Sequence, residues 1–223
     1  MSIQILHETP DFIVVNKAAN MPSQPDKTET PSILTLLEAQ IGQRLYLIHR
    51  LDRVASGVIL FAKTEKAAAN LSRQFLLRTV EKKYLAIVEN APPSVSGSFE
   101  HYLKQNTTKN RSYAYTDTQK NAKKALLEYK QIAASDRYFL IEVNLLTGRH
   151  HQIRAQFAAE KMYIRGDVKY GAKRVLQDRS ISLLAKSLSF EDPTSGEKMF
   201  FEAPFPEDAL WQYFENMIAE AKA

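Results

Sequence analysis

The sequence predicts an α/β protein, because strand patterns and helix patterns both occur within its 223 residues. Val58–Ala62 is an apolar run without alternation, which is typical of a strand that is buried on both faces. Apolar residues recur at helical spacing over residues 33–41, and Gly42 follows as a helix-ending residue. Several segments between residues 98 and 146 have the composition of further strands. The length allows one large domain or two small ones with a full core.

The remaining elements follow from local signals along the chain. Thr30 followed by Pro31 predicts the start of the first helix, because a hydroxyl can cap it and proline suits the first helical position. Thr64 can cap a second helix that ends near Arg78. The third helix follows Gly148, which we expect to allow the turn, and ends near Glu160. We expect strands at residues 3–6, 12–17, 81–88, 98–103, 111–116, 125–133, 137–146 and 180–190, and a last helix after Phe205-Pro206.

The composition excludes several classes of protein. The chain has no cysteine, so it can form neither disulfides nor thiolate centres, and this fits a reducing compartment. The first residues lack a charged region followed by an apolar one, as a signal peptide would have. No apolar run approaches the ~20 residues that cross a bilayer. We therefore expect a cytoplasmic protein without membrane association.

The positive charge is concentrated in one segment. The net charge is +5, and the stretch from Lys104 to Lys124 accounts for all of it, with six basic residues and one acid, Asp117. Such a patch suits a polyanion such as RNA, but it also suits a solvated hairpin kept soluble by its lysines. Tyr113 and Tyr115 could stack unpaired bases there or pack onto the sheet. The basic residues are Lys104, Lys109, Arg111, Lys120, Lys123 and Lys124.

A polar cluster precedes the buried strand. Asp52 lies between Arg50 and Arg53, directly before Val58–Ala62. A carboxylate held at the start of a buried strand is placed on rigid scaffold, which suits a catalytic group. Taken alone, the same pattern also fits a loop aspartate with solvated neighbours.

Three motifs resemble the signature of the RluA-type pseudouridine synthases. The first is His49-Arg50-Leu51-Asp52 with Ala55-Ser56-Gly57-Val58, the second is the Lys-x-Tyr that ends at Tyr84, and the third is Thr147–Arg154. Asn16-Lys17 and Gly166–Gly171 match further family segments. The chain departs from the family at Ala18 and Asn20, where proline and glycine are usual. It also lacks the usual His-Pro before Gly166 and has Leu183-Leu184-Ala185 in place of Leu-His-Ala.

The resemblance implies a catalytic site made of Asp52, Tyr84 and Arg154. Asp52 would act at the ribose, Arg154 would pair with Asp52, and Tyr84 would stack on the uracil. An unperturbed aspartate has a pKa of about 3.9, so Arg154 is needed to aim the carboxylate and keep it ionised in a closed site. Breaking and remaking the bond between base and ribose involves no redox change and no group transfer. No cofactor and no metal are therefore expected.

The resemblance also implies the architecture and the partner. We expect a single catalytic domain over residues 1–223, with a long mixed, mainly antiparallel sheet, flanking helices and a central cleft. Because a strand already begins at Ile3, we expect no separate N-terminal RNA-binding domain. We expect a monomer that acts on ribosomal or transfer RNA. The expected RNA-binding residues are Arg50, Lys109, Arg111, Lys123 and Lys124.

Two alternatives are weighed against this interpretation. An inactive RNA-binding protein of the same fold would be expected to lack Asp52, Tyr84 or Arg154, and all three are present. A nucleoside or glycoside hydrolase would use two carboxylates about 5 to 10 Å apart. The central motif offers one acid, with Asp167 as a speculative second. A hydrolase would release free uracil, whereas a synthase keeps the base attached.

Overall fold

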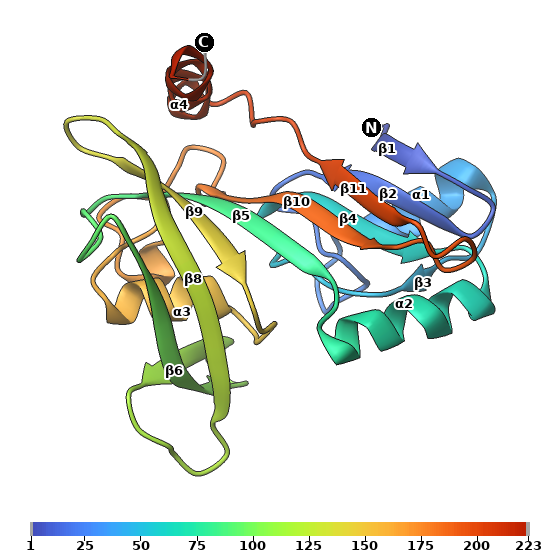
Figure 1. Cartoon of the computed structure of the whole chain (residues 1–223), viewed down its shortest axis with the longest axis horizontal. Coiled ribbons are helices and arrows are strands. Elements are labelled where there is room, and N and C mark those ends of the chain that lie inside the picture. The colour runs from blue at the N-terminus through green and yellow to red at the C-terminus, as the bar shows by residue number, and fades with distance from the viewer. Residues whose placement is uncertain (1, 222–223) are drawn as a thin grey trace. The chain divides into compact units, whose positions relative to one another are not determined.

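The computed structural model describes residues 2–221, and the chain divides into two compact units (Figure 1). Unit 1 comprises Met1–Lys82 and Leu184–Pro204, and unit 2 comprises Lys83–Leu183 and Phe205–Ala223. Each unit contains strands and helices of its own.

Unit 1 is built on a mixed sheet. Its strands follow the order β1-β2-β4-β10, with β11 paired to β10 and β3 paired to β4. Only β4 and β10 run parallel among these pairs. Val58–Ala62 is buried throughout, as the uninterrupted apolar run predicts. The strands are β1 (Gln4–Glu8), β2 (Phe12–Lys17), β3 (Tyr46–Leu47), β4 (Ser56–Ala62), β10 (Leu183–Glu191) and β11 (Lys198–Glu202).

The two helices of unit 1 have well-defined caps. α1 (Ile33–Ile41) begins after Ser32, whose Oγ accepts a hydrogen bond from the Thr35 N–H at 3.1 Å. The predicted start at Thr30-Pro31 is therefore wrong by two residues, because Ser32 supplies the cap. α2 (Glu65–Leu77) begins after Thr64, as predicted, and ends at Arg78 in the left-handed conformation. Figure 1 shows α2 next to β3.

Gly57 permits the close approach of the two parallel strands. It has a φ of +117° and lies opposite Ala185 in the β4–β10 register. A Cβ atom at Gly57 would lie 2.2 Å from the carbonyl oxygen of Ala185, far inside van der Waals contact. Only glycine fits this position, both for space and for backbone conformation. The start of β4, which follows the Asp52 loop, is thereby fixed against β10.

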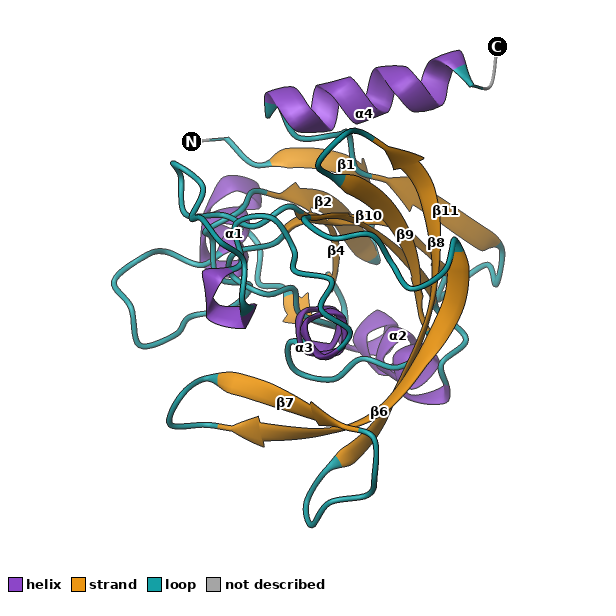
Figure 2. Cartoon of the chain, turned by 90° about the vertical axis from the view of Figure 1, so that its left-hand side faces the viewer, coloured by secondary structure: helices purple, strands orange, loops and turns teal. Residues whose placement is uncertain are grey.

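Unit 2 carries an antiparallel sheet in the order β5-β9-β8-β6-β7. Figure 2 shows β6 and β7 as a long hairpin. Its turn at residues 107–110 matches the hairpin tip that the sequence predicts. The strands are β5 (Glu81–Val88), β6 (Ser96–Asn106), β7 (Arg111–Tyr115), β8 (Lys123–Ala134) and β9 (Phe139–Leu145).

The first helix of unit 2, α3 (Gln152–Ala159), packs with its apolar side chains toward the sheet. Ile153 and Phe157 are buried, as predicted. The turn before α3 differs from the prediction, because His151 adopts the left-handed conformation with a φ of +52°, and Gly148 does not. A single 3₁₀ turn, η1 (Val168–Tyr170), follows further along the chain.

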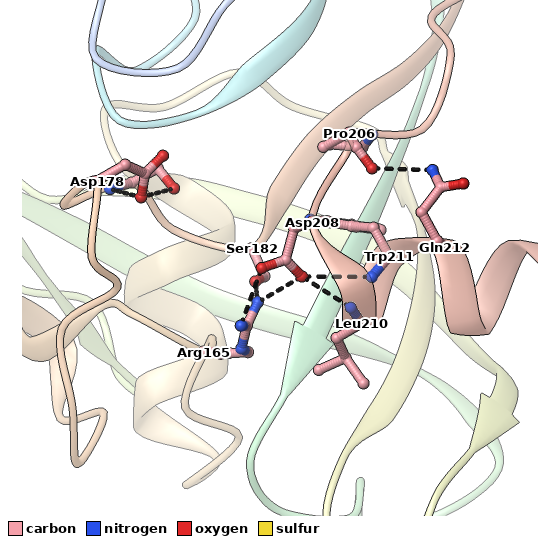
Figure 3. Close-up of polar contacts among 9 residues, drawn as sticks. Arg165, Asp178, Ser182, Pro206, Asp208, Leu210, Trp211 and Gln212 are labelled. Atoms are coloured by element: carbon pink, nitrogen blue, oxygen red, sulfur yellow. Dashed lines mark hydrogen bonds and ion pairs between the residues drawn. The ribbon is translucent and has the colours of Figure 1, made fainter.

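The last helix, α4 (Ala209–Glu220), is anchored at its N-terminus by Asp208 (Figure 3). One Asp208 oxygen accepts hydrogen bonds from the N–H groups of Leu210 and Trp211, at 3.0 and 3.4 Å. The same carboxylate accepts two hydrogen bonds from Arg165, each 3.0 Å long. Trp211 and Phe214 are buried, which confirms the predicted packing role of this helix.

The strands, helices and mainly antiparallel pairing confirm the predicted α/β class. The elements that the sequence did not indicate are β3, β11 and η1, each at most five residues long. No helix within residues 2–221 is long and apolar enough to cross a membrane.

Candidate active site

Asp52 lies in the loop between β3 and β4 of unit 1, and its side chain is half-buried. The backbone on both sides of it is fixed. The hydroxyl of buried Ser23 accepts a hydrogen bond from the Leu51 N–H at 3.1 Å and donates one to the Leu51 carbonyl at 2.9 Å. The Asp52 carbonyl accepts from the Ala55 N–H at 3.1 Å. These contacts hold the backbone at Asp52 in a defined turn, which is what a catalytic group on a rigid scaffold requires.

A buried lysine lies beneath the same loop. Lys17, the last residue of β2, is 0% exposed. Its Nζ donates hydrogen bonds to the carbonyls of Ala18, Met21 and Arg53, at 2.8, 2.9 and 3.2 Å. Burial lowers the pKa of Lys17 to about 7, and the negative charge of Asp52 acts in the opposite direction. Asp52 is therefore close enough to Lys17 to influence its protonation.

The two arginines beside Asp52 differ in their contacts. Arg53 binds the loop that follows β2, since its guanidinium donates to the Asn20 carbonyl and to the hydroxyls of Thr28 and Thr30, at 3.2, 3.2 and 2.9 Å. Arg50 is exposed to solvent. Arg53 is also exposed, but its guanidinium is engaged by these three acceptors, so Arg50 is the better candidate for contact with a ligand.

His49 belongs to the packing of the loop. Its Nε2 accepts a hydrogen bond from the Leu60 N–H at 3.1 Å, and its ring stacks on Phe75 with centroids 4.8 Å apart. Burial, together with the charge of Lys82, lowers the pKa of His49 to about 3. The imidazole is thus neutral at pH 7 and acts as a structural acceptor.

Tyr84 lies in unit 2, on β5, where it pairs with Val143 of β9. Its side chain is half-buried, whereas Leu85–Val88 of the same strand are buried. The ring therefore sits where a regular strand passes from the core toward solvent.

Arg154 is the third residue of α3 and is only 5% exposed. It forms a bidentate ion pair with Asp167, in which Nε donates to Oδ2 at 2.7 Å and Nη2 donates to Oδ1 at 2.9 Å. Asp167 is 2% exposed. Because the guanidinium occupies both carboxylate oxygens of Asp167, this acid is a structural partner of Arg154. It is not available as the second catalytic acid that a hydrolase would need.

Tyr170 supports Arg154 from another side. Its ring is 3% exposed and lies between two guanidinium groups, with Arg154 at 4.9 Å and Arg111 at 4.8 Å from its centroid. The Tyr170 hydroxyl accepts from the Ser112 N–H at 2.8 Å and contacts Nδ1 of His151 at 3.0 Å. Burial, followed by the charge of Arg154, lowers the pKa of His151 to about 2, so Nδ1 of the neutral ring can accept from the hydroxyl.

The other four residues expected to bind RNA, besides Arg50, lie in different surroundings within unit 2. Lys109, in the hairpin turn, and Lys123, at the start of β8, are exposed. Lys124 is exposed too, but its Nζ pairs with Glu100 at 2.7 Å. Arg111 is half-buried and stacks on Tyr113 at 5.3 Å as well as on Tyr170. Of these four residues, Lys109, Lys123 and Lys124 are therefore exposed, and Lys124 is engaged by Glu100.

The sequence did not indicate several of the supporting residues. Lys17 lies in a family-like segment that the sequence marks only as scaffold, and Ser23 begins the loop predicted after it. Their contacts with the Asp52 loop join residues 36 and 28 positions apart. Asp167 and Tyr170 were noted within a family-like stretch, but not as partners of Arg154. The available signal is a lysine at the end of the strand Phe12–Lys17, shortly after the apolar run Phe12–Val15.

Comparison with known proteins agrees with these motifs. A family model described as RNA pseudouridylate synthase matches residues 11–159. The chain is 33% identical to tRNA pseudouridine synthase C of Haemophilus ducreyi, with 98% of this chain and 96% of the relative covered. It is 30% identical to ribosomal large subunit pseudouridine synthase D of Zymomonas mobilis, over 97% of this chain and 74% of the relative.

A solved structure shares the fold. The human protein described as RNA pseudouridylate synthase domain containing 1 matches with a TM-score of 0.78 and 25% identity, over 94% of this chain and 86% of that one. The family match, the two relatives and this structure confirm the resemblance seen in the motifs. The chain therefore belongs to the RNA pseudouridylate synthase family, whose members isomerise uridine in RNA to pseudouridine.

Proposed function

We propose that this enzyme isomerises specific uridines of transfer or ribosomal RNA, with Asp52 as the catalytic carboxylate. The observation that carries the proposal is the way in which unit 1 holds Asp52. A buried hydroxyl fixes the residue before it, a buried ammonium fixes the residue after it, and a fully buried strand follows. The names of the relatives supply the two classes of RNA.

The reaction requires three things of the protein. The bond between C1′ of the ribose and N1 of uracil breaks, the base turns, and a bond forms between C1′ and C5. The proton on C5 is released, N1 regains a proton, and the composition of the nucleotide is unchanged. The protein must therefore act at the ribose, hold the detached base and keep water away from it.

Each expected site residue has a role in this scheme. Asp52 acts at the ribose, and Tyr84 stacks on the uracil. Arg154 pairs with Asp52 once the site is closed, because a nearby cation keeps a desolvated carboxylate ionised. The ion pair with Asp167 supports this role, since it orients Arg154 before RNA arrives. Arg50 contacts the RNA backbone or fills the space left by the flipped uridine.

Binding to RNA is assigned to the hairpin segment. Lys109 and Lys123 contact phosphates, and Arg111 and Lys124 also contribute to RNA binding. We further propose that units 1 and 2 make up one catalytic domain, because the family match spans both. We further propose that the enzyme acts as a monomer in the cytoplasm.

The test is to map pseudouridine in cellular RNA from a strain that lacks this gene. The strain is complemented with the wild-type protein or with Asp52→Asn. We expect one or a few pseudouridines to disappear and only the wild type to restore them. Full restoration by Asp52→Asn would show that the reaction does not use this carboxylate, and free uracil in the reaction would show a hydrolase.

A further inference from the structure

We propose that Lys17 is a positioning residue for Asp52 and that it functions only as the charged ammonium. This inference rests on the proposed role of Asp52. It concerns a side chain that takes no part in the chemistry, because Lys17 is 0% exposed and its Nζ is surrounded by backbone carbonyls.

The Lys17 ammonium has as many N–H donors as it has carbonyl partners. An ammonium group has three N–H donors and no acceptor. Three carbonyl oxygens lie within 3.2 Å of the Lys17 Nζ, so each N–H has one partner. Ala18 and Met21 belong to the segment after β2, whereas Arg53 directly follows Asp52. One buried cation therefore ties the Asp52 loop to the strand next to it.

Removing the proton would break this arrangement. A neutral amine has two N–H donors and one lone pair. One of the three carbonyls would then lose its hydrogen bond and face the lone pair of the nitrogen, which is unfavourable in a buried site. The contact with Arg53 is the longest of the three, at 3.2 Å, and it is the one that holds the Asp52 loop.

The protonation of Lys17 is poised to change near neutral pH. Burial lowers its pKa to about 7, with the charge of Asp52 raising it and the charge of Arg53 lowering it. These two side chains are the charged groups of unit 1 that act on the ammonium. As pH rises through about 7, Lys17 thus passes from the charged ammonium to the neutral amine.

Activity and stability then depend on pH in opposite directions. The pKa of Lys17 is about 7 in the folded protein and 10.5 in its ordinary state. Between these values the unfolded chain binds more protons, so this group makes the fold more stable as pH rises. The hydrogen bond from the Lys17 ammonium to the Arg53 carbonyl, which holds the Asp52 loop, is weakened over the same range. A loss of activity through general loosening of the protein would instead accompany a loss of stability.

The experiment measures tritium release from RNA labelled with [5-³H]uridine, isolated from cells that lack the gene. Single-turnover rate constants are determined from pH 6 to pH 8, with the melting temperature recorded at each pH. For a group with a pKa of about 7, the protonated fraction falls about tenfold over this interval. We expect the wild-type rate constant to fall about tenfold while the melting temperature does not fall.

Two lysine variants complete the test. Lys17→Met is expected to react at pH 6 no faster than the wild type at pH 8, and to show no further dependence on pH. Lys63→Met is the matched control, because Lys63 is a largely covered lysine that directly follows β4, the strand paired with β2, and it forms an ion pair with Glu8. It should keep the wild-type rate and pH profile.

Two results would overturn the proposal. One is a wild-type rate constant that does not change between pH 6 and pH 8, which decides the question even if Lys17→Met fails to fold. The other is a folded Lys17→Met that keeps the wild-type rate and slope. Asp52→Asn is measured in parallel, and full activity of this variant would instead refute the proposed role of Asp52.

Discussion

Arg154 and Asp167 form a bidentate ion pair in which both side chains are almost completely removed from water. They lie thirteen residues apart, on α3 and just before η1. Both carboxylate oxygens accept from the guanidinium, and Tyr170 packs against the face of that guanidinium. Arg154 therefore has a defined orientation within unit 2 alone. Such an arrangement lowers the cost of ordering the arginine when RNA binds.

Removal of the carboxylate should destabilise the protein strongly. In Asp167→Asn the buried guanidinium of Arg154 loses its counter-charge, and breaking a buried pair from one side costs about 3–5 kcal/mol. We expect a decrease of about 3 kcal/mol in the free energy of unfolding, measured by urea denaturation. The rate of pseudouridine formation at saturating RNA should also fall, because Arg154 loses its orientation.

A solvent-accessible ion pair provides the control for this prediction. Lys63 and Glu8 pair at 2.6 Å, but 38% of the Glu8 side chain is exposed. Glu8→Gln should therefore cost less than about 1 kcal/mol. Equal losses for Asp167→Asn and Glu8→Gln would show that burial of the Arg154 pair does not determine its contribution.

Gly57→Ala should prevent the normal approach of β4 to β10. The new Cβ would meet the Ala185 backbone at 2.2 Å, and a φ of +117° is unfavourable for alanine. We expect a loss of more than about 3 kcal/mol of stability, since overpacking and backbone strain add. Gly42→Ala is the comparison, because Gly42 has a φ of +68° but open space around it. That variant should lose only about 1–2 kcal/mol, the cost of the left-handed conformation alone.

The stability of the protein should fall in mild acid. The pKa of His49 is lowered from its ordinary value of 6.5 to about 3, and that of His151 to about 2. Both rings therefore stay neutral in the folded protein at pH values well below 6.5. Between these limits the unfolded chain binds more protons, so the free energy of unfolding decreases as pH falls below 6.5. Each histidine should contribute about 1.4 kcal/mol per pH unit between pH 6 and pH 4.

His49→Gln isolates the contribution of His49 to the acid sensitivity of the protein. Gln does not titrate, and its side-chain oxygen can still accept the hydrogen bond from the Leu60 N–H. Urea denaturation of His49→Gln at pH 6, 5 and 4 should therefore give a slope smaller by about 1.4 kcal/mol per pH unit. An unchanged slope would mean that His49 is protonated in the folded protein.

Much of the fold follows from local patterns in the sequence. The run Val58–Ala62, the cap at Thr64 and the strand Glu81–Val88 were predicted within a residue or two, because each depends on neighbouring side chains. The site is different. Lys17 and Asp167 act on partners that are distant along the chain, so their functions depend on tertiary packing that periodicity does not encode.

The first helix shows how local signals can compete. Thr30-Pro31 and Ser32 are both reasonable starts, but Ser32 is the residue whose hydroxyl accepts from a helical N–H, that of Thr35. Thr30 instead accepts a hydrogen bond from Arg53. Ser32→Ala should therefore cost about 1 kcal/mol in the free energy of unfolding, the usual contribution of an N-cap. A Ser32→Ala protein as stable as the wild type would show that another group caps α1.

The exposed lysines of the hairpin should contribute unequally to RNA binding. Each cation that neutralises a phosphate changes the slope of log K against log salt by about 0.7–0.9. Lys109→Ala should reduce this slope by about that amount, as measured by filter binding at several salt concentrations. Lys130→Ala, an exposed lysine on β8 outside the basic segment, should leave the slope unchanged. An unchanged slope for Lys109→Ala would remove the hairpin turn from the RNA-binding surface.

Substitutions at the ion pair between Lys124 and Glu100 test the same RNA-binding surface. Its ammonium pairs with Glu100 at 2.7 Å, so part of its charge is already neutralised by the protein. Lys124→Ala should therefore change the salt slope less than Lys109→Ala does. Glu100→Gln frees the ammonium for a phosphate and should both tighten RNA binding and steepen its dependence on salt. Weaker binding by Glu100→Gln would show that RNA does not approach this edge of β6 and β8.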